Sequence, residues 1–242
     1  IITHSTCPIV HAADDISVME SLQALPWIFE SVNVFAEGKP YWIGPTAIGM
    51  RMNPYGAGPM PNPDNVRRAM AETDPRQRGL FNAAWTLGYV SRAVAGGVAG
   101  LCLSSIAGPS AITWQKMNWA QPWFDEQGSE IAVFPVYHVI AGLASRSGAN
   151  VRLLDCSDPH TVAALALDTG DGQELWLANL NSERRQVSLR GIGADAIVER
   201  LDAETFRLCC SGPDGFSSTA KPLDTTSITL GAYAVVRTAW SS

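Results

Sequence analysis

Residues 3–15 read THSTCPIVHAADD, and this stretch decides how the first part of the chain is interpreted. It contains two of the chain's four histidines together with a cysteine and two aspartates. A helix-start signal follows it, because Ser17 and Glu20 have the spacing of a capping box. A strand that leads into a helix is the junction at which barrel enzymes carry their catalytic groups. The stretch therefore predicts a βα unit whose connecting loop holds candidates for chemistry.

Strand and helix signals continue to alternate after this stretch. We expect the helix that begins at Ser17 to kink or restart at Pro26 and to stop at Gly38. Asp74-Pro75 predicts the start of a second long helix, because aspartate at the N-cap followed by proline is the preferred order. The other expected elements are strands at 1–3, 8–10, 41–48 and 98–103, a short helix at 64–72, a lid-like loop at 104–132, the end of the second long helix at 96–97 and a closing helix at 134–145. The run 98–103 is apolar throughout, which predicts a strand buried on both faces.

The pattern changes after Gly148, where short β-type runs alternate with turn signals such as Gly170-Asp171-Gly172. No helical stretch is expected in this part. The spacing is typical of an antiparallel β-sandwich. The strand candidates are 151–154, 161–168, 174–179, 186–189, 197–201, 206–210 and 227–238.

The two patterns predict two domains, 1–147 and 148–242. A complete (β/α)8 barrel needs about 200–250 residues, so we expect 1–147 to hold the C-terminal three βα units of a TIM-type barrel. The chain opens at Ile1 directly in apolar sequence, which predicts a fragment whose first five units are missing. A truncated barrel leaves an unpaired strand edge, and we expect homo-oligomers to form through it.

Composition excludes several classes of protein. The net charge is −6 and no basic run occurs, so nucleic acid is not an expected partner. No apolar run approaches the roughly 20 residues of a membrane span, and the first residues show no charged segment followed by an apolar one, so no signal peptide is expected in them. The five cysteines are odd in number and fit neither a disulfide framework nor a zinc site, so we expect reduced thiols and a cytoplasmic protein.

Four long strings stand out in this sequence, at 3–15, 17–22, 43–56 and 74–85. In this order they resemble the D-apionate lactonase family. The resemblance implies a barrel related to glycoside hydrolases, an appended sandwich, and a hydrolase that opens D-apionolactone to D-apionate in branched-sugar catabolism. It also implies members that extend further at the N-terminus, with active-site acids in that portion. Residues 104–109 depart from the expected pattern, which leaves the substrate contacts of that loop open.

The candidate catalytic residues are His11, Asp14 and Arg51. Lactone hydrolysis needs a base that activates water, and a histidine just after a strand end is suited to that role. Asp14 is the candidate to orient the imidazole, and Arg51 the candidate to anchor the lactone carbonyl or the product carboxylate. The structural alternatives are that Asp14 only favours a helix N-terminus and that Arg51 pairs with a structural carboxylate.

Five further residues are candidates for binding the substrate, a small sugar lactone. Each also has a structural interpretation as a core histidine, a helix-start carboxylate, a turn former or a loop anchor. They are His4, Asp15, Asn53, Tyr55 and Trp114. The spacing of His4 and His11 fits no standard metal motif, so no metal or other cofactor is expected. Cys7 is a weak candidate nucleophile, and Asp74–Arg78 is expected to be a helix start with its charges toward solvent.

Two alternatives remain open: a glycoside hydrolase of the barrel-plus-sandwich type, and a non-catalytic carbohydrate-binding piece. Retaining glycosidases need two carboxylates about 5–5.5 Å apart. The family resemblance implies that one of them would follow the strand at 41–48, but residues 48–53 contain no Asp or Glu. This favours a lactonase over a glycosidase.

Overall fold

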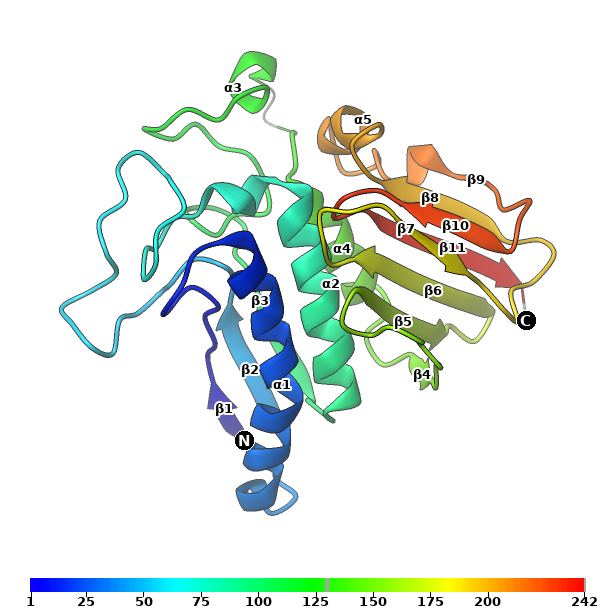
Figure 1. Cartoon of the computed structure of the whole chain (residues 1–242), viewed down its shortest axis with the longest axis horizontal. Helices are drawn as coiled ribbons and strands as arrows, with labels where there is room; N and C mark the ends of the chain where they lie inside the picture. The colour runs from blue at the N-terminus through cyan, green and yellow to red at the C-terminus, as the bar shows by residue number, and fades with distance from the viewer. Residues whose placement is uncertain (129–130, 242) are drawn as a thin grey trace.

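The computed structural model describes residues 1–128 and 131–241 (Figure 1). Its first part contains a three-stranded parallel sheet in the order β1-β2-β3. The strands are β1 (Ile2–His4), β2 (Tyr41–Thr46) and β3 (Gly100–Leu103). Helices α1 (Asp15–Ala36) and α2 (Leu80–Ala95) make the two connections between them. This is the repeated βα pattern that the sequence predicts for a barrel.

The parallel sheet is covered on one face only. Tyr41 and Ile43 point toward the helices and are buried, and Phe29 of α1 packs edge-on against Tyr41. On the other face Trp42 is 48% exposed, and Cys102 is exposed as well. The prediction that 98–103 is buried on both faces is therefore wrong, because nothing in the described chain covers the second face.

The first helix begins earlier than predicted. Asp14, rather than Ser17, is the N-cap of α1, and its carboxylate accepts a hydrogen bond from Ser17 N at 2.9 Å. The helix then runs without interruption through Pro26 to Ala36. The expected extended segment at 8–10 forms a turn.

The second predicted helix begins and ends where its cap residues indicate, but it is divided into two pieces. Asp74 caps a 3₁₀ turn (Pro75–Arg78), Gly79 interrupts it, and α2 then ends at Gly96 as predicted. No helix forms at 64–72, where Asn65 and Met70 have positive φ angles. The segment is instead tied across by the Asn62 side chain, which bonds the backbone of Val66 at both its N–H and its carbonyl.

The long connection after β3 is anchored by aromatic side chains. A single-turn helix α3 (Phe124–Gln127) interrupts it, and Phe124 packs edge-on against Phe134 at 4.9 Å between ring centroids. Trp114 and Trp123 pack partly buried against the same cluster. Helix α4 (Pro135–Ala144) follows and packs against α2.

The second part is an antiparallel sandwich of one large and one small sheet. Its core lies between the sheets and is formed by residues such as Leu177, Ile228 and Val236. The large sheet has the order β4 (Asn150–Arg152), β5 (Val162–Asp168), β6 (Gly172–Asn179), β11 (Val235–Ser241), β8 (Ile197–Leu201) and β9 (Lys221–Pro222). The small sheet pairs β10 (Ser227–Leu230) with β7 (Arg185–Ser188).

Two predictions for the sandwich are wrong. Residues 206–210 form helix α5 (Phe206–Cys210) instead of a strand, and a 3₁₀ turn (Ser217–Thr219) follows it. The helix forms because Asp202 accepts from the backbone N–H groups of Glu204 and Thr205 just before it. The single strand expected at 227–238 is divided into β10 and β11 by a turn.

The two parts share one hydrophobic core. Helix α2 lies between the parallel sheet and the large sheet of the sandwich (Figure 1). Trp176 of β6 is fully buried, and its ring covers Gly142 of α4 so closely that a Cβ there would lie 2.5 Å from it. His138 of α4 is also buried, and its Nε2 contacts the carbonyl oxygen of Cys209 in α5 at 2.8 Å. Burial lowers the pKa of this imidazole.

No helix in residues 1–128 and 131–241 is long and apolar enough to cross a bilayer. Over the same ranges, no three His, Cys, Asp or Glu side chains are grouped as a metal site requires.

Candidate functional site

The carboxyl ends of β1, β2 and β3 lie at the same edge of the parallel sheet, toward the top of Figure 1. Three loops leave from this edge: 5–14, 47–79 and 104–134. We call this edge and its loops the rim. Barrel enzymes build their active sites at the corresponding edge, so each candidate residue is placed relative to it.

Hydroxyl groups hold two strand ends together at the rim. Thr46 Oγ1 donates to the carbonyl of Thr6 at 3.0 Å, so the 2.8 Å contact between the two threonine hydroxyls uses the proton of Thr6. Tyr89 OH of α2 lies 2.8 Å from Thr6 Oγ1 and must donate to it. Burial raises the pKa of Tyr89, which keeps the phenol protonated. Each of the three protons is committed, so this chain of hydroxyls is structural.

Arg51 lies at the rim just beyond β2 and is exposed. Its Nη2 donates to the carbonyl of Ser104, at the end of β3, over 2.7 Å. Ser104 presents that carbonyl from a left-handed backbone conformation, with φ of 56°, which is uncommon for a residue other than glycine. One donor of the guanidinium is therefore fixed, while the others make no hydrogen bond within residues 1–128 and 131–241.

His11 lies on the loop after β1 and is exposed. Within the described residues its ring makes no hydrogen bond, and the expected contact with Asp14 does not form. The Asp14 carboxylate is occupied by the helix cap, and its hydrogen bonds from Ser17 lower its pKa. The structural alternative for Asp14, a role at the helix N-terminus, is thus present in the molecule.

Asp15 belongs to a charge cluster that is buried at Asp74 and Arg76 and open to solvent at Arg67. It pairs with Arg67 and with Arg76, each at 3.2 Å. Arg76 in turn donates from Nε and Nη2 to both carboxylate oxygens of Asp74, at 2.8 and 2.6 Å. Arg76 and Gln77 are buried, so the expectation that Asp74–Arg78 turns its charges to solvent is wrong. The charges can be buried because they neutralise one another across two loops.

His4 and Cys7 are both occupied by the fold. His4 alternates with Thr3 along β1 and therefore faces the helices, and its ring stacks on Tyr41. Its Nδ1 lies 3.1 Å from the carbonyl of Ser5, and its Nε2 lies 2.6 Å from the hydroxyl of Tyr41. Cys7 donates to the carbonyl of Ile48, and burial raises its pKa, which disfavours the thiolate that a nucleophile needs.

Asn53 and Tyr55 belong to the loop after β2. The Asn53 side chain accepts from Tyr55 N and donates to the carbonyl of Gly58, so it shapes the loop as the structural alternative predicts. The Tyr55 side chain is 76% exposed and free to contact a ligand. Trp114 is partly buried in the aromatic cluster around Phe124. These three residues are therefore not gathered around one cavity.

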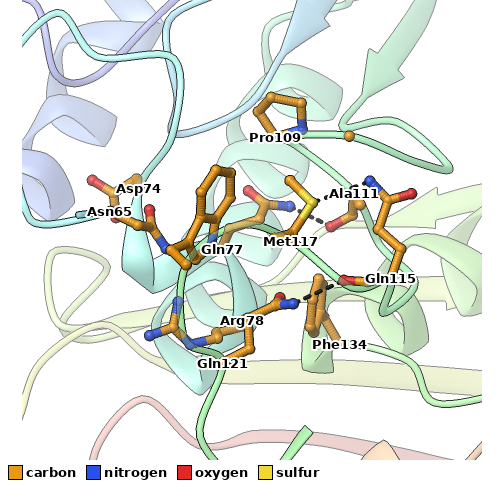
Figure 2. Close-up of a pocket in the computed structure, with 12 residues that line it drawn as sticks. Asn65, Asp74, Gln77, Arg78, Pro109, Ala111, Gln115, Met117, Gln121 and Phe134 are labelled. Atoms are coloured by element: carbon orange, nitrogen blue, oxygen red, sulfur yellow. Dashed lines mark hydrogen bonds between the residues drawn. The ribbon is translucent and has the colours of Figure 1, made fainter. Parts of the chain in front are cut away.

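A pocket opens between two of the rim loops (Figure 2). Its cavity volume is about 20 Å³, which is room for one or two water-sized groups. Arg78 and Gln77 come from the turn before α2, and Trp119 and Gln121 come from the loop after β3. None of these four residues is among the eight candidate site residues above, although Trp119, like Trp114, belongs to the loop expected to form a lid.

The rim thus brings together Arg51 and Ser104, with His11 on the adjacent loop, whereas His4, Asp14 and Asp15 have structural partners. Sequence reasoning missed Thr46, Ser104 and Arg78. A signal existed for the first two, because each ends or directly follows a strand that was predicted. Arg78 gave no comparable signal, since its position depends on how two distant loops meet.

Comparison with known proteins agrees with this architecture. The model of the D-apionate lactonase TIM-barrel domain matches residues 1–148, and that of the family's C-terminal immunoglobulin-like domain matches residues 159–238. A D-apionate lactonase from Brucella anthropi is 40% identical over 188 residues, which cover 78% of this chain but 29% of that protein.

Solved structures give the same fold at low sequence identity. An α-L-arabinofuranosidase from Thermotoga maritima in complex with arabinose superposes with a TM-score of 0.57 at 10% identity, over 99% of this chain and 52% of that one. A conserved exported protein from Bacteroides fragilis gives 0.56 at 11% identity, over 98% and 46%. At these identities the likeness concerns the fold alone. The two domain matches and the curated relative show that this chain belongs to the D-apionate lactonase family.

Proposed function

We propose that this chain is the C-terminal part of a hydrolase that opens a sugar lactone, with D-apionolactone as substrate and D-apionate as product. The observation that carries the proposal is its 40% identity to a D-apionate lactonase over 188 residues. Because the chain spans 29% of that relative, the activity belongs to a longer protein, and we expect the chain alone to be inactive. The setting is the catabolism of a branched sugar in the cytoplasm.

The proposed fold of that longer protein explains the uncovered face of the parallel sheet. Its three βα units, within residues 1–147, would be the last three of a (β/α)8 barrel, and the sandwich would occupy 148–242. The preceding strands would then pair with the free edge of β1 and cover Trp42. When those strands are missing, a second copy of the chain is the proposed occupant of this edge.

Arg51 is the proposed electrophilic group. When water attacks a lactone, negative charge develops on the carbonyl oxygen, and a fixed donor there stabilises the transition state. The hydrogen bond to Ser104 holds the guanidinium at the rim and leaves further donors for this oxygen. After ring opening, the same fork suits the carboxylate of the product.

His11 is the proposed base that activates the water. It is exposed on the loop beside the rim and unencumbered by hydrogen bonds within the described chain. Its orientation cannot come from Asp14, which is engaged in the helix cap. Upstream acids of the longer protein are the proposed source of that orientation. Of the binding candidates, Tyr55 is retained because it is exposed on the neighbouring loop.

A glycoside hydrolase is the weaker alternative. Within the described chain, the residues directly after β1, β2 and β3 include no Asp or Glu: they are Ser5–Pro8, Ala47–Met50 and Ser104–Ala107. A retaining mechanism would therefore need both of its carboxylates from elsewhere. Lactone opening has no such requirement.

The test is proton release from aldonolactones by the longer protein. Replacing Arg51 by Ala should lower kcat by about 10²–10³, and replacing His11 by Ala by about 10²–10⁴. Arg190→Ala and His160→Ala are matched controls, because both residues are exposed and belong to the sandwich rather than to the rim. Intact lactones with wild-type protein, together with nitrophenol release from aryl glycosides, would favour the glycosidase instead.

A further inference from the structure

The pocket between the turn before α2 and the loop after β3 contains an arginine with no acidic partner. Within the described residues no carboxylate lies within 4 Å of the Arg78 guanidinium, although this side chain is half-buried. The nearby carboxylates are already engaged: Asp74 by Arg76, and Asp125 by Lys116 at 3.3 Å. Burial lowers the pKa of Arg78 more than the charges of Asp125 and Asp74 raise it, so holding this charge here costs free energy.

Arg76, two residues earlier, shows how this fold treats a guanidinium that is structural. It makes two hydrogen bonds to Asp74 and a third to Asp15. Arg78 instead contacts a neutral group: the Asn65 amide, with its oxygen turned toward them, accepts from Arg78 Nη1 at 2.9 Å and from Trp119 Nε1 at 3.0 Å. An arginine has five donors, and within the described residues most of those of Arg78 have no acceptor. A free anion is the group that would satisfy them.

Two buried amides beside Arg78 offer acceptors as well. Gln77 Nε2 donates to the carbonyl of Ala111 and Gln121 Nε2 to the carbonyl of Gln115, both at 2.8 Å, as the dashed lines in Figure 2 mark. These bonds fix which way each amide faces. Within the described chain, no protein donor reaches either Oε1 atom. Both side chains line the pocket, so a hydroxyl group of a ligand has acceptors next to the guanidinium.

We propose that this pocket binds the carboxylate end of a small 2-hydroxy acid, with Arg78 as the anchor and Gln77 and Gln121 as acceptors for the adjacent hydroxyl. The cavity of about 20 Å³ is too small for a sugar ring and holds one or two water-sized groups, so one carboxylate oxygen and the adjacent hydroxyl fill it while the rest of the acid lies toward solvent. The inference rests on the proposed function in one respect, because lactone opening produces an acid of this class. It makes the pocket a product or regulatory site distinct from Arg51.

Titration of the 242-residue chain with sodium D-gluconate, followed by NMR of the Trp119 indole N–H and the glutamine side-chain amides, tests the proposal. Gluconate should shift these signals with a Kd of about 1–10 mM, as expected for a small polar ligand. D-Glucitol has the hydroxyls without the carboxylate, and butyrate has the carboxylate without the hydroxyls. Both should bind at least about tenfold more weakly than gluconate. Glucitol loses the hydrogen bonds to the charged Arg78, and butyrate leaves the acceptors of Gln77 and Gln121 without a hydroxyl donor.

Variants locate the binding. Arg78→Gln should weaken gluconate by at least about tenfold, and Arg78→Lys by less, because the charge stays but the fork is lost. Arg68→Gln changes the same charge on the same loop and should bind gluconate as the wild type does. If Arg78→Gln fails to fold, the lysine variant and the three ligands still decide the question.

Unmoved Trp119 and glutamine signals at 50 mM gluconate would overturn the inference, as would glucitol binding equal to gluconate or an Arg78→Gln variant that binds normally. Each failure is separable from that of the proposed function. A longer protein that hydrolyses lactones while gluconate leaves the pocket unchanged refutes this inference alone. Binding of gluconate through Arg78, with every lactone left intact by the longer protein, refutes the lactonase proposal alone.

Discussion

The two main sheets of this molecule use tryptophan in opposite ways. Trp176, in the six-stranded sheet, is fully buried against Gly142 and Phe216. Trp42, in the parallel sheet, lies across Gly100 on the uncovered face and keeps 48% of its surface exposed. The six-stranded sheet is packed on both faces and stabilises the fold. The parallel sheet is packed on one face and serves mainly to position the loops at its carboxyl edge.

Charged groups also differ between the sheet and the rim, apart from the paired cluster of Asp15, Arg67, Arg76 and Asp74. In the six-stranded sheet the buried Glu174 pairs with Arg146 at 2.5 Å, and the buried Glu199 pairs with Arg237 at 2.8 Å. At the rim, Arg51 and Arg78 have no carboxylate partner within the described chain. Burying a charge costs desolvation free energy, which a close partner offsets in part, whereas a buried charge without a partner is retained at a larger cost in stability. The contrast separates groups that hold the fold from groups that are available for chemistry.

The largest effect should come from the pair of tryptophans. Trp176→Ala removes a fully buried ring and should lower the free energy of unfolding by about 3–5 kcal/mol. Trp42→Ala removes a half-exposed ring and should cost about 1–2 kcal/mol. Urea denaturation of both variants measures the difference. Equal losses would mean that the uncovered face is buried in solution, for example by a second copy, and dilution should then reduce the effect of Trp42→Ala.

A smaller effect tests whether hydroxyl groups fix the strand ends. Thr6→Val leaves Tyr89 OH without its acceptor and Thr46 Oγ1 without its donor, so unfolding should become easier by about 1–3 kcal/mol. Thr3→Val is the matched control, because Thr3 is exposed on the uncovered face of β1. A stability of Thr6→Val equal to that of Thr3→Val would show that the rim is held by packing alone.

The helix cap is the next test. Asp14→Ala removes the acceptor for Ser17 N and should lower Tm by about 2–4 °C, while Asp14→Ser should retain it. The hydrogen bonds lower the pKa of Asp14, so its contribution is present above about pH 3.8 and is lost as the pH falls. Lactone hydrolysis by Asp14→Ser in the longer protein is the sharper readout. A loss of kcat without a loss of Tm would return Asp14 to a catalytic role.

The smallest effect is a pH dependence at the contact between α4 and α5. Burial lowers the pKa of His138 in the folded state, so the folded protein binds fewer protons there than the unfolded chain. Stability from this site is therefore complete above about pH 6.5 and declines as the pH falls below it. The decline should be absent in His138→Gln, measured as the difference in unfolding free energy between the two proteins at each pH. Parallel curves for both proteins would contradict it.

Local signals predicted a large share of the fold. Asp74-Pro75 at a helical start and Gly96 at a helical end are correct because caps depend on a few adjacent residues. The sandwich predicted from alternating turns and β-type runs after Gly148 is also correct, because turns too depend on a few adjacent residues. The helix at 64–72 failed because Asn62 bonds the backbone of that segment more effectively than a helix would. Such competition depends on side-chain geometry that periodicity does not record.

The site was less predictable than the fold. The sequence indicated that Arg51 follows a strand, and it does so at the rim. It did not indicate that the Asp14 carboxylate faces Ser17, because the capping box at Ser17 is an equally good local signal. Nor did it indicate that Arg76 is buried while Arg78 is not paired. Those differences arise from the approach of Asp15 and of the loop after β3, each of which is distant along the chain.

The committed protons of Thr6, Thr46 and Tyr89 have an evolutionary consequence. Each hydroxyl can donate one hydrogen bond. Tyr89 of α2 donates to Thr6, which follows β1, Thr6 donates to Thr46 of β2, and Thr46 donates to the backbone carbonyl of Thr6. Replacement of Thr6 alone leaves Tyr89 without an acceptor and Thr46 without a donor. Single replacements at these positions should therefore be rarer than joint ones. An alignment of relatives should therefore show the three positions changing together. The matched apolar set is Val at position 6, Ala at position 46 and Phe at position 89.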